Sequence, residues 1–199
     1  MGEPLHSVLI FGHSFVKRLK TDLHANFDER ASLSFSLGEN ASVSMRGIGG
    51  RTVPKVLQFD KSVLTRAKPD VLILELGTND LSSSRPEIVG SNLDDLVSFL
   101  LDSCGVHVIG VCGVIPRRGH DPAVADFNSK MALLNQYLEV VFESNPRVFT
   151  WFHRGFQNPT CNLYLHDGVH LNSTGQYRLY RSYRGAILQA LRLLDSTFP

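Results

Sequence analysis

The sequence contains few cysteines, and they form no recognisable pair. Cys104, Cys112 and Cys161 are three in number, with no CxxC motif among them. An odd number of cysteines without such a motif predicts neither a disulfide framework nor a zinc site, and it favours a reducing compartment. The first residues, MGEPLHS, also lack the basic segment and the apolar run of a signal peptide. We therefore expect a cytoplasmic location.

Long apolar runs and an excess of charge of one sign are absent as well. The apolar runs are far shorter than the roughly 18 residues that a membrane-spanning helix needs. The 20 Lys and Arg residues almost balance the 19 Asp and Glu residues, so the formal net charge is only +1. Such a charge supplies no overall attraction to nucleic acid or to an anionic membrane. Binding of either kind would need a local basic patch.

The composition is that of an ordinary globular domain. Hydrophobic residues make up 43% and charged residues 20% of the 199 positions, which excludes a disordered, collagenous or coiled-coil chain. The length fits one domain over residues 1–199. Because the first expected strand begins almost at once and the last expected helix nearly ends the chain, we expect a domain excised from a larger protein.

Short apolar runs alternate with stretches of helical periodicity. The run VLILEL is apolar at nearly every position, which is typical of parallel strands covered on both faces. This alternation predicts right-handed βαβ units and a three-layer α/β/α sandwich. The expected strands are Ser7–Phe11, Val43–Met45, Val71–Leu76, Val106–Val111 and Val148–Trp151. The expected helices are Phe15–Arg30, Val53–Arg66, Glu87–Ser103, Val124–Ser144 and Gly175–Asp195.

Ligands of such a sheet bind beyond the carboxyl ends of the strands, so the residues that follow each strand are of most interest. Ser14 follows the first strand at the start of a helix, where it is either a nucleophile beside free backbone N–H groups or a simple helix N-cap. The glycines of GIGGRT, residues 47–52, either let the backbone approach a ligand closely or form a tight turn.

Two further segments carry polar groups that suit acyl transfer. Asn79 in GTND either donates its amide to a developing oxyanion or forms an Asx turn. Asp167 and His170 are three residues apart, so one turn of chain can bring them to the same side. The aspartate can then accept the imidazole Nδ1–H, which leaves Nε2 to take a proton from a serine hydroxyl. The alternative for this pair is an ordinary surface turn.

Together, these fragments resemble the sequence blocks of the SGNH (GDSL-like) hydrolase family. IFGHSF is similar to the first block, GIGGRT to the second, LELGTND to the third and HDGVHLN to the fifth. The first block departs from the family, because His13 stands where the family usually has aspartate. A first block of the GHSFV type also resembles the esterase domain in the first-reading-frame protein of some LINE-type retrotransposons.

The family resemblance implies a fold and a set of roles. The fold is a flavodoxin-like sheet of five parallel strands in the order 2-1-3-4-5. Ser14 matches the nucleophile, His170 the general base, and Asp167 the residue that orients the base. The oxyanion hole would comprise the backbone N–H groups of Ser14 and Gly50 and the side-chain amide of Asn79, with Gly49 as the alternative to Gly50.

The reaction that the resemblance implies is ester hydrolysis through an acyl-enzyme. We expect a serine esterase acting on a small-molecule (acetyl) or lipid ester, with no cofactor and no metal. One alternative is a carbohydrate deacetylase. The other is a catalytically weak module of a larger protein that associates with a membrane or with RNA.

Two residues outside the family pattern form one hypothesis. Glu75 is a carboxylate inside an otherwise apolar strand, and a buried carboxylate needs a partner. His13 is that partner if the first and third strands are neighbours. We assign His13 a packing or hydrogen-bonding role rather than that of the base, because it and Ser14 are adjacent on a turn and point in different directions.

Two segments carry basic residues. Arg117, Arg118, His120 and Asp121 lie in the loop after the fourth strand, which we interpret as solvated rather than as an anion site. Likewise, Arg178, Arg181 and Arg184 of the last helix are interpreted as solvent-facing rather than as RNA or lipid contacts. The core stripe expected of this helix is Leu179, Tyr183, Ile187, Ala190 and Leu194.

Overall fold

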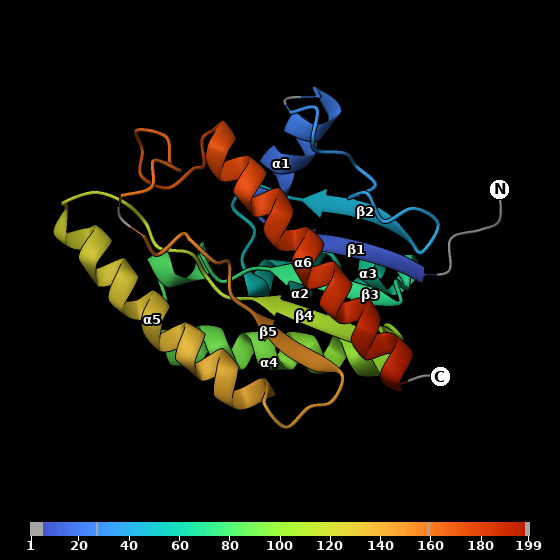
Figure 1. Ribbon diagram of the computed structural model, residues 1–199. Coiled ribbons are helices and arrows are strands. Elements are labelled where there is room, and N and C mark those ends of the chain that lie inside the picture. Colours follow the sequence, from blue (N-terminus) through green and yellow to red (C-terminus); the bar gives the residue numbers. More distant parts are fainter. Residues whose placement is uncertain (1–5, 27, 159, 198–199) are drawn as a thin grey trace.

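A computed structural model describes residues 6–26, 28–158 and 160–197 of the chain (Figure 1). Its centre is one sheet of five parallel strands in the order β2-β1-β3-β4-β5. The predicted strand order and sandwich architecture are therefore confirmed. The strands are β1 (His6–Gly12), β2 (Ala41–Gly47), β3 (Val71–Glu75), β4 (Val108–Cys112) and β5 (Val148–Trp151).

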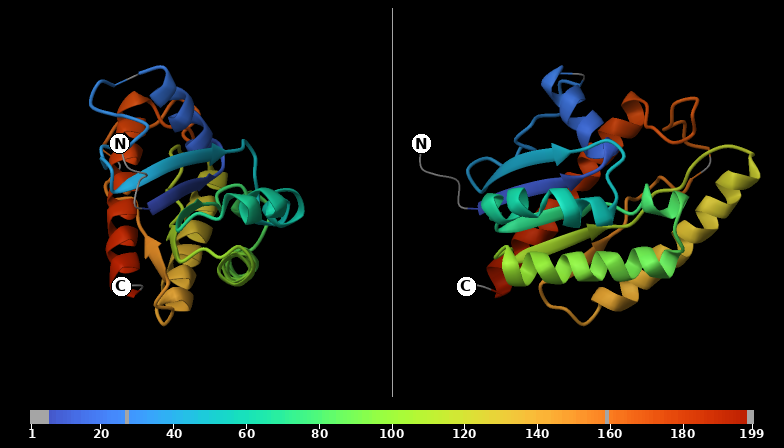
Figure 2. Two further views of the ribbon diagram at one scale, coloured as in Figure 1. Left: turned by 90° about the vertical axis from the view of Figure 1, so that its right-hand side faces the viewer. Right: turned by 180° about the vertical axis from the view of Figure 1, so that it is seen from behind.

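Helices cover both faces of the sheet, which gives the three layers (Figures 1 and 2). The side chains of α1 and α6 pack on one face, and those of α2, α3, α4 and α5 pack on the other. The predicted core stripe of the last helix is confirmed, since all five of its residues are buried. The helices are α1 (Ser14–His24), α2 (Val53–Phe59), α3 (Lys61–Ala67), α4 (Pro86–Ser103), α5 (Pro122–Phe142) and α6 (Ser173–Thr197), with a short 3₁₀ turn η1 (Asp80–Ser82).

Two predicted helices differ from the structure. The helix expected over Phe15–Arg30 ends at His24, because Asn26 takes a left-handed conformation with φ 50°. The helix expected over Val53–Arg66 is interrupted at Asp60, which ends α2 and begins α3. The carboxylate of Asp60 is buried, and the Arg51 guanidinium lies 2.9 Å from it (Nε to Oδ2). In this pair Asp60 has a φ of −111° and a ψ of −5°, which depart from ideal helical values and separate α2 from α3. The strand boundaries differ from the expected ones by no more than two residues.

None of the helices in the described part of the chain is long and apolar enough to cross a membrane.

The carboxyl ends of β1 and β2 approach the neighbouring backbone so closely that glycine is needed there. A Cβ on Gly12 would overlap the carbonyl oxygen of Glu75, and a Cβ on Gly47 would overlap the backbone of Lys17 in α1. These two glycines therefore let α1 and β3 lie against the ends of the first two strands. The same contacts bring the turn between β1 and α1 to the end of β3.

This packing yields a stability prediction. Gly47→Ala should lower the free energy of unfolding by about 1–3 kcal/mol, because the added methyl group meets backbone that cannot move aside cheaply. The matched control is Gly49→Ala, two residues along, where an added Cβ meets nothing within 4 Å and should leave stability unchanged or slightly raised. Urea unfolding of both variants measures the difference. Equal stabilities would contradict the close approach of β2 and α1.

Candidate active site

Ser14 lies at the carboxyl end of the sheet, as predicted. It is the first residue of α1, directly beyond the end of β1, and its side chain is half-buried. The helix is capped by His13 and not by Ser14, since the His13 Nδ1 accepts a hydrogen bond from the Phe15 N–H at 3.4 Å. The Ser14 hydroxyl has no hydrogen-bond partner among the described residues. Both its oxygen and its own N–H are therefore available at the helix start.

The glycine-rich segment after β2 forms a turn beside the end of β1, and Gly49 and Gly50 of this turn are exposed. The Ile48 N–H donates to the Gly12 carbonyl at 2.9 Å, and the Arg51 N–H donates to the Ile48 carbonyl at 3.2 Å. Gly50 has a φ of 67°, a conformation that favours glycine. Neither Gly49 nor Gly50 has an acceptor for its N–H within the described ranges. The segment is thus a tight turn with two unused backbone donors.

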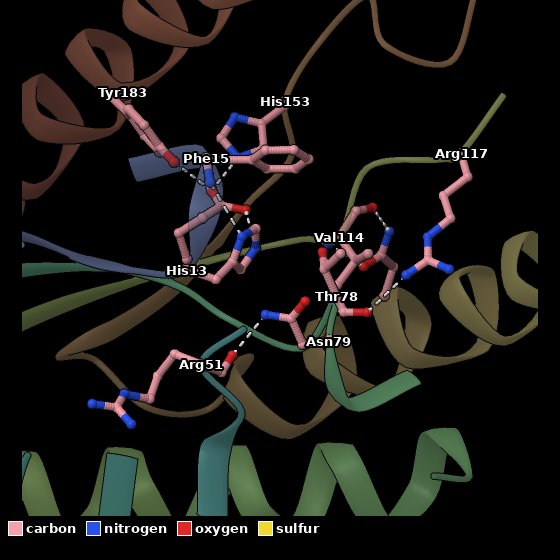
Figure 3. Close-up of polar contacts among 11 residues, drawn as sticks. His13, Phe15, Arg51, Thr78, Asn79, Val114, Arg117, His153 and Tyr183 are labelled. Carbon is pink, nitrogen blue, oxygen red and sulfur yellow. Dashed lines mark hydrogen bonds and ion pairs between the residues drawn. The ribbon is translucent and has the colours of Figure 1, made fainter. Parts of the chain in front are cut away.

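Asn79, which lies between β3 and η1, joins the end of β3 to this turn. Its Nδ2 donates to the Arg51 carbonyl oxygen at 2.9 Å, as Figure 3 shows. The side chain makes no capping hydrogen bond to η1, so the Asx-turn alternative is not what the structure has. An amide nitrogen carries two hydrogens, and one bond to Arg51 leaves the second for another acceptor.

Two buried aspartates, Asp60 and Asp80, bind residues at the end of this turn. Sequence reasoning assigned neither of them a role. Asp80 Oδ1 accepts the Val53 N–H at 2.9 Å, which fixes the start of α2, and burial raises the pKa of Asp80. The ion pair of Asp60 with Arg51 fixes the same end of the glycine-rich segment, two residues before Val53. Both contacts join residues that are distant enough in sequence to leave no local pattern.

Asp167 and His170 form the pair that their spacing predicts. Asp167 Oδ2 lies 2.6 Å from His170 Nδ1, and Asp167 Oδ1 accepts the backbone N–H groups of Val169 and His170 at 2.9 and 2.8 Å. Although partial burial raises the pKa of Asp167, the hydrogen bonds from His170 and Val169 lower it to about 2. The carboxylate is therefore ionised at neutral pH and holds Nδ1, which leaves Nε2 of His170 uncommitted.

The segment that carries this pair is a small hairpin-like unit tied to the rest of the site. Tyr164 bridges to Leu171, and the Leu165 N–H donates to the His170 carbonyl at 2.7 Å. The Arg118 N–H donates to the Gly168 carbonyl, also at 2.7 Å. These bonds anchor the turn between Asp167 and His170 from both sides.

His170 and Ser14 lie in the same neighbourhood but are not hydrogen-bonded to each other within the described residues. Burial is the main cause that lowers the pKa of His13, and charge repulsion from His153 and His170 adds to it.

The hypothesis that His13 partners Glu75 agrees with the geometry. Strands β1 and β3 are neighbours, and His13 Nε2 lies 3.7 Å from Glu75 Oε1 with both side chains buried. Sequence reasoning missed two more partners, His153 and Tyr183, each of which contacts Glu75 Oε2 at 2.9 Å (Figure 3). Tyr183 was expected only as a core residue, and His153 follows β5 in a loop without a pattern.

One group of potential metal ligands coincides with this cluster. The ligand atoms of Glu75, Cys112 and His153 lie within 4.8 Å of one another, and all three residues are buried. The distance of 2.9 Å between His153 Nε2 and Glu75 Oε2 is that of a hydrogen bond. We therefore interpret the group as a hydrogen-bonded network.

The loop after β4 is bound to the protein rather than solvated, so that interpretation was wrong for its arginines. The Arg117 guanidinium lies 3.7 Å from the centre of the Phe127 ring and donates to Ser82 Oγ at 2.9 Å. The Arg118 guanidinium donates to the Phe156 carbonyl at 2.6 Å. Both arginines therefore brace the loops around the site.

The solvent-facing interpretation was wrong for two of the three arginines of α6. Arg184 donates to the Phe35 carbonyl at 3.0 Å, and Arg178 donates to the Gly155 carbonyl at 3.2 Å. Arg181 is exposed, as expected. The ring of Tyr180, which lies between these arginines in sequence, is buried and stacks on Phe35.

Residues 10–178 match the model of the GDSL-like lipase/acylhydrolase family, and this range contains all the site segments described above. The chain belongs to the GDSL-like lipase/acylhydrolase family. No curated protein matches the chain. The narrower resemblance to a retrotransposon esterase domain stays a prediction.

Solved structures of this family share the fold. A GDSL-like lipase from Bacteroides thetaiotaomicron is 18% identical, with a TM-score of 0.71 over 96% of this chain and 93% of that one. A catalytic mutant of an acetylxylan esterase from Geobacillus stearothermophilus is 16% identical, with a TM-score of 0.66 over 97% and 95% of the two chains. TesA is 20% identical, with a TM-score of 0.66 over 94% and 99%.

The Asp167–His170 contact predicts a measurable titration. In an NMR titration, the Asp167 carboxyl should have its midpoint at about 2, and His170→Ala should move the midpoint upward because the side-chain hydrogen bond is lost. Since the pKa is depressed on folding, the stabilisation from this contact is fully present above the unfolded pKa of about 3.9 and is lost as the pH falls toward 2. A midpoint at the unfolded value in both proteins would show that the contact does not form.

Proposed function

We propose that this acylhydrolase is a serine esterase in which Ser14 attacks the ester carbonyl, His170 is the general base and Asp167 orients His170. The observation that carries the proposal is the 2.6 Å contact between Asp167 Oδ2 and His170 Nδ1. It leaves the second imidazole nitrogen unused at the same end of the sheet as Ser14, which has a free hydroxyl. A serine, an imidazole and a carboxylate in these roles are the parts that acyl transfer requires.

The reaction proceeds in two steps. In the first, Nε2 of His170 takes the hydroxyl proton of Ser14 as the oxygen attacks the carbonyl carbon, and the imidazolium returns that proton to the leaving alcohol. In the second, His170 takes a proton from water as the water oxygen attacks the acyl-enzyme, and the imidazolium then returns that proton to the Ser14 oxygen as the acid leaves. The ionised Asp167 stabilises the imidazolium in both steps.

The unused donors around Ser14 support an oxyanion hole. The Ser14 N–H stands at the start of α1, the N–H of Gly50 points from the exposed turn after β2, and Asn79 has one amide hydrogen beyond its bond to Arg51. Gly49 also has an unused N–H and remains the alternative to Gly50. Donors fixed before the reaction stabilise the developing negative charge without reorganising.

The substrate class that we propose is an acyl ester with a small (acetyl) or lipid acyl group. The likeness to an acetylxylan esterase favours acetyl esters, including those on carbohydrate, and the likeness to a GDSL-like lipase favours longer acyl groups. Hydrolysis of either class of ester begins with the same attack by Ser14. The loops around the site decide between them, because the fold is common to both.

The nucleophile is tested with p-nitrophenyl esters from acetyl to long acyl chains. Ser14→Ala should lower kcat at least about 10³-fold, since it removes the attacking oxygen. It should leave the thermal unfolding curve almost unchanged, because the hydroxyl makes no hydrogen bond to a described residue. Ser129→Ala, which removes an exposed hydroxyl on α5, is the matched control and should retain full activity. Equal turnover by Ser14→Ala and the wild type would refute the proposal.

The role of Asn79 is tested in the same assay. Asn79→Ala should lower kcat by about 10²–10³-fold, equivalent to about 3–4 kcal/mol of transition-state stabilisation, with little change in KM. Because this variant also loses the bond to the Arg51 carbonyl, its unfolding free energy is measured alongside. A rise in KM at constant kcat would assign Asn79 to substrate binding and exclude it from the oxyanion hole.

A further inference from the structure

We propose that Glu75 and His13 form a buried clamp that fixes the turn carrying Ser14, so that both are positioning residues for the nucleophile. The kinetic part of this inference rests on the proposed esterase function. Neither residue belongs to the Ser14–His170–Asp167 set, and neither is needed to transfer a proton. The two residues act by fixing the positions of the Ser14 side-chain oxygen and the Ser14 backbone N–H.

His13 is held by Glu75 at two points. Its backbone N–H donates to the Glu75 carbonyl oxygen at 3.2 Å, and its side-chain Nε2 lies 3.7 Å from the Glu75 carboxylate. The other ring nitrogen, Nδ1, accepts the Phe15 N–H at 3.4 Å. An acceptor nitrogen is unprotonated, so in a neutral ring the proton is on Nε2 and points toward the carboxylate. The His13 ring therefore links the backbone of Phe15, the residue after Ser14, to the Glu75 carboxylate.

Glu75 divides its two oxygens between different elements. Oε2 receives His153 Nε2 and the Tyr183 hydroxyl, each at 2.9 Å. Oε1 faces His13, and neither Oε1 nor His13 Nε2 has a hydrogen-bond partner in the described part of the chain. The Cys112 thiol also lies against the carboxylate, and burial followed by the Glu75 charge raises its pKa well above the usual value. The thiol therefore stays protonated and adds no second negative charge.

The charges of the cluster favour this contact. Burial raises the pKa of Glu75, but His153, His13 and the Tyr183 hydroxyl outweigh it and lower the pKa below the ordinary value. Burial lowers the pKa of His13, with Glu75 opposing that effect. An ionised Glu75 and a neutral His13 are the result. At a buried position, the N–H dipole of His13 is attracted to the carboxylate more strongly than it would be in solvent.

The last helix braces the clamp from behind. His153 Nδ1 contacts Ser182 Oγ at 2.8 Å, and the same oxygen accepts the Trp151 indole N–H at 2.9 Å. A chain of polar contacts therefore runs from α6 through His153 and Glu75 to the residue next to the nucleophile. These side chains are packed among buried neighbours, which restricts the movement of Glu75.

The clamp is tested with variants that separate its two contacts. His13→Asn keeps an acceptor near the Nδ1 position and loses the Nε2–H, whereas His13→Gln keeps a donor near the Nε2 position. Glu75→Gln keeps the shape and removes the charge. Glu75→Gln and His13→Asn should each lower kcat about 10–100-fold with KM within about twofold, which is the range for a misplaced reacting group. His13→Gln should recover about tenfold over His13→Asn, and the double variant Glu75→Gln/His13→Asn should be no slower than Glu75→Gln alone.

Leu72→Ala is the matched control for loss of stability. Leu72 is fully buried in the same strand as Glu75, and it pairs with Leu9 of β1, away from the turn that carries Ser14. Its truncation should destabilise the protein while leaving kcat of the folded fraction unchanged. The clamp is overturned if Leu72→Ala lowers kcat as much as Glu75→Gln does, or if the effects of Glu75→Gln and His13→Asn multiply in the double variant.

A second readout requires no turnover. Imidazole ¹⁵N shifts of the wild type should show the proton of His13 on Nε2. Glu75→Gln should speed hydrogen exchange at the Phe15 amide at least about tenfold, because the His13 ring loses its charged partner. A proton on Nδ1, or unchanged exchange in Glu75→Gln, would overturn the clamp. If the wild type shows no turnover that depends on Ser14, the esterase proposal fails and these spectra alone decide on the clamp. Should Glu75→Gln not fold, the His13→Asn and His13→Gln pair gives the same comparison.

Discussion

A carboxylate that is cut off from water must find its counter-charge and hydrogen bonds inside the protein, and the carboxylate of Glu75 imposes this demand at the centre of the sheet. Its partners come from three parts of the chain: the turn after β1, the loop after β5 and the middle of α6. These parts meet only in the observed arrangement of strands and helices. The last helix is therefore joined to the nucleophile turn by polar contacts as well as by apolar packing.

The end of the sheet is organised by single hydrogen bonds between segments. Asn79 binds the carbonyl of Arg51, Asp80 binds the N–H of Val53, and the Arg118 N–H binds the carbonyl of Gly168. Each bond joins two segments that are separated in sequence by more than 25 residues. Each of the three bonds uses a backbone group from at least one of its partners. The side chain of that partner therefore contributes nothing to the bond. Such an arrangement fixes the segments around Ser14 relative to one another.

The parts that sequence predicts well are those encoded locally. Apolar runs predicted the five strands, and the short spacing between Asp167 and His170 predicted their contact. Contacts between distant segments were beyond such reasoning. Tyr183 shows the same helical spacing as its apolar neighbours, so nothing in the pattern marks its hydroxyl as a partner of Glu75. The break between α2 and α3 depends on Asp60 meeting Arg51 in three dimensions. His13 and Glu75 were paired only by assuming that their strands are neighbours, which the topology bears out.

The carboxylate and the imidazole of the Asp167–His170 contact lie on one short segment, closed by the bridge between Tyr164 and Leu171. The segment carries the carboxylate and the imidazole together, whereas Ser14 is built into the turn between the sheet and its first helix. The Arg118 N–H ties this segment to the loop after β4 through the Gly168 carbonyl. A change in that loop therefore shifts the position of the imidazole relative to Ser14 while the Asp167–His170 contact inside the segment is kept.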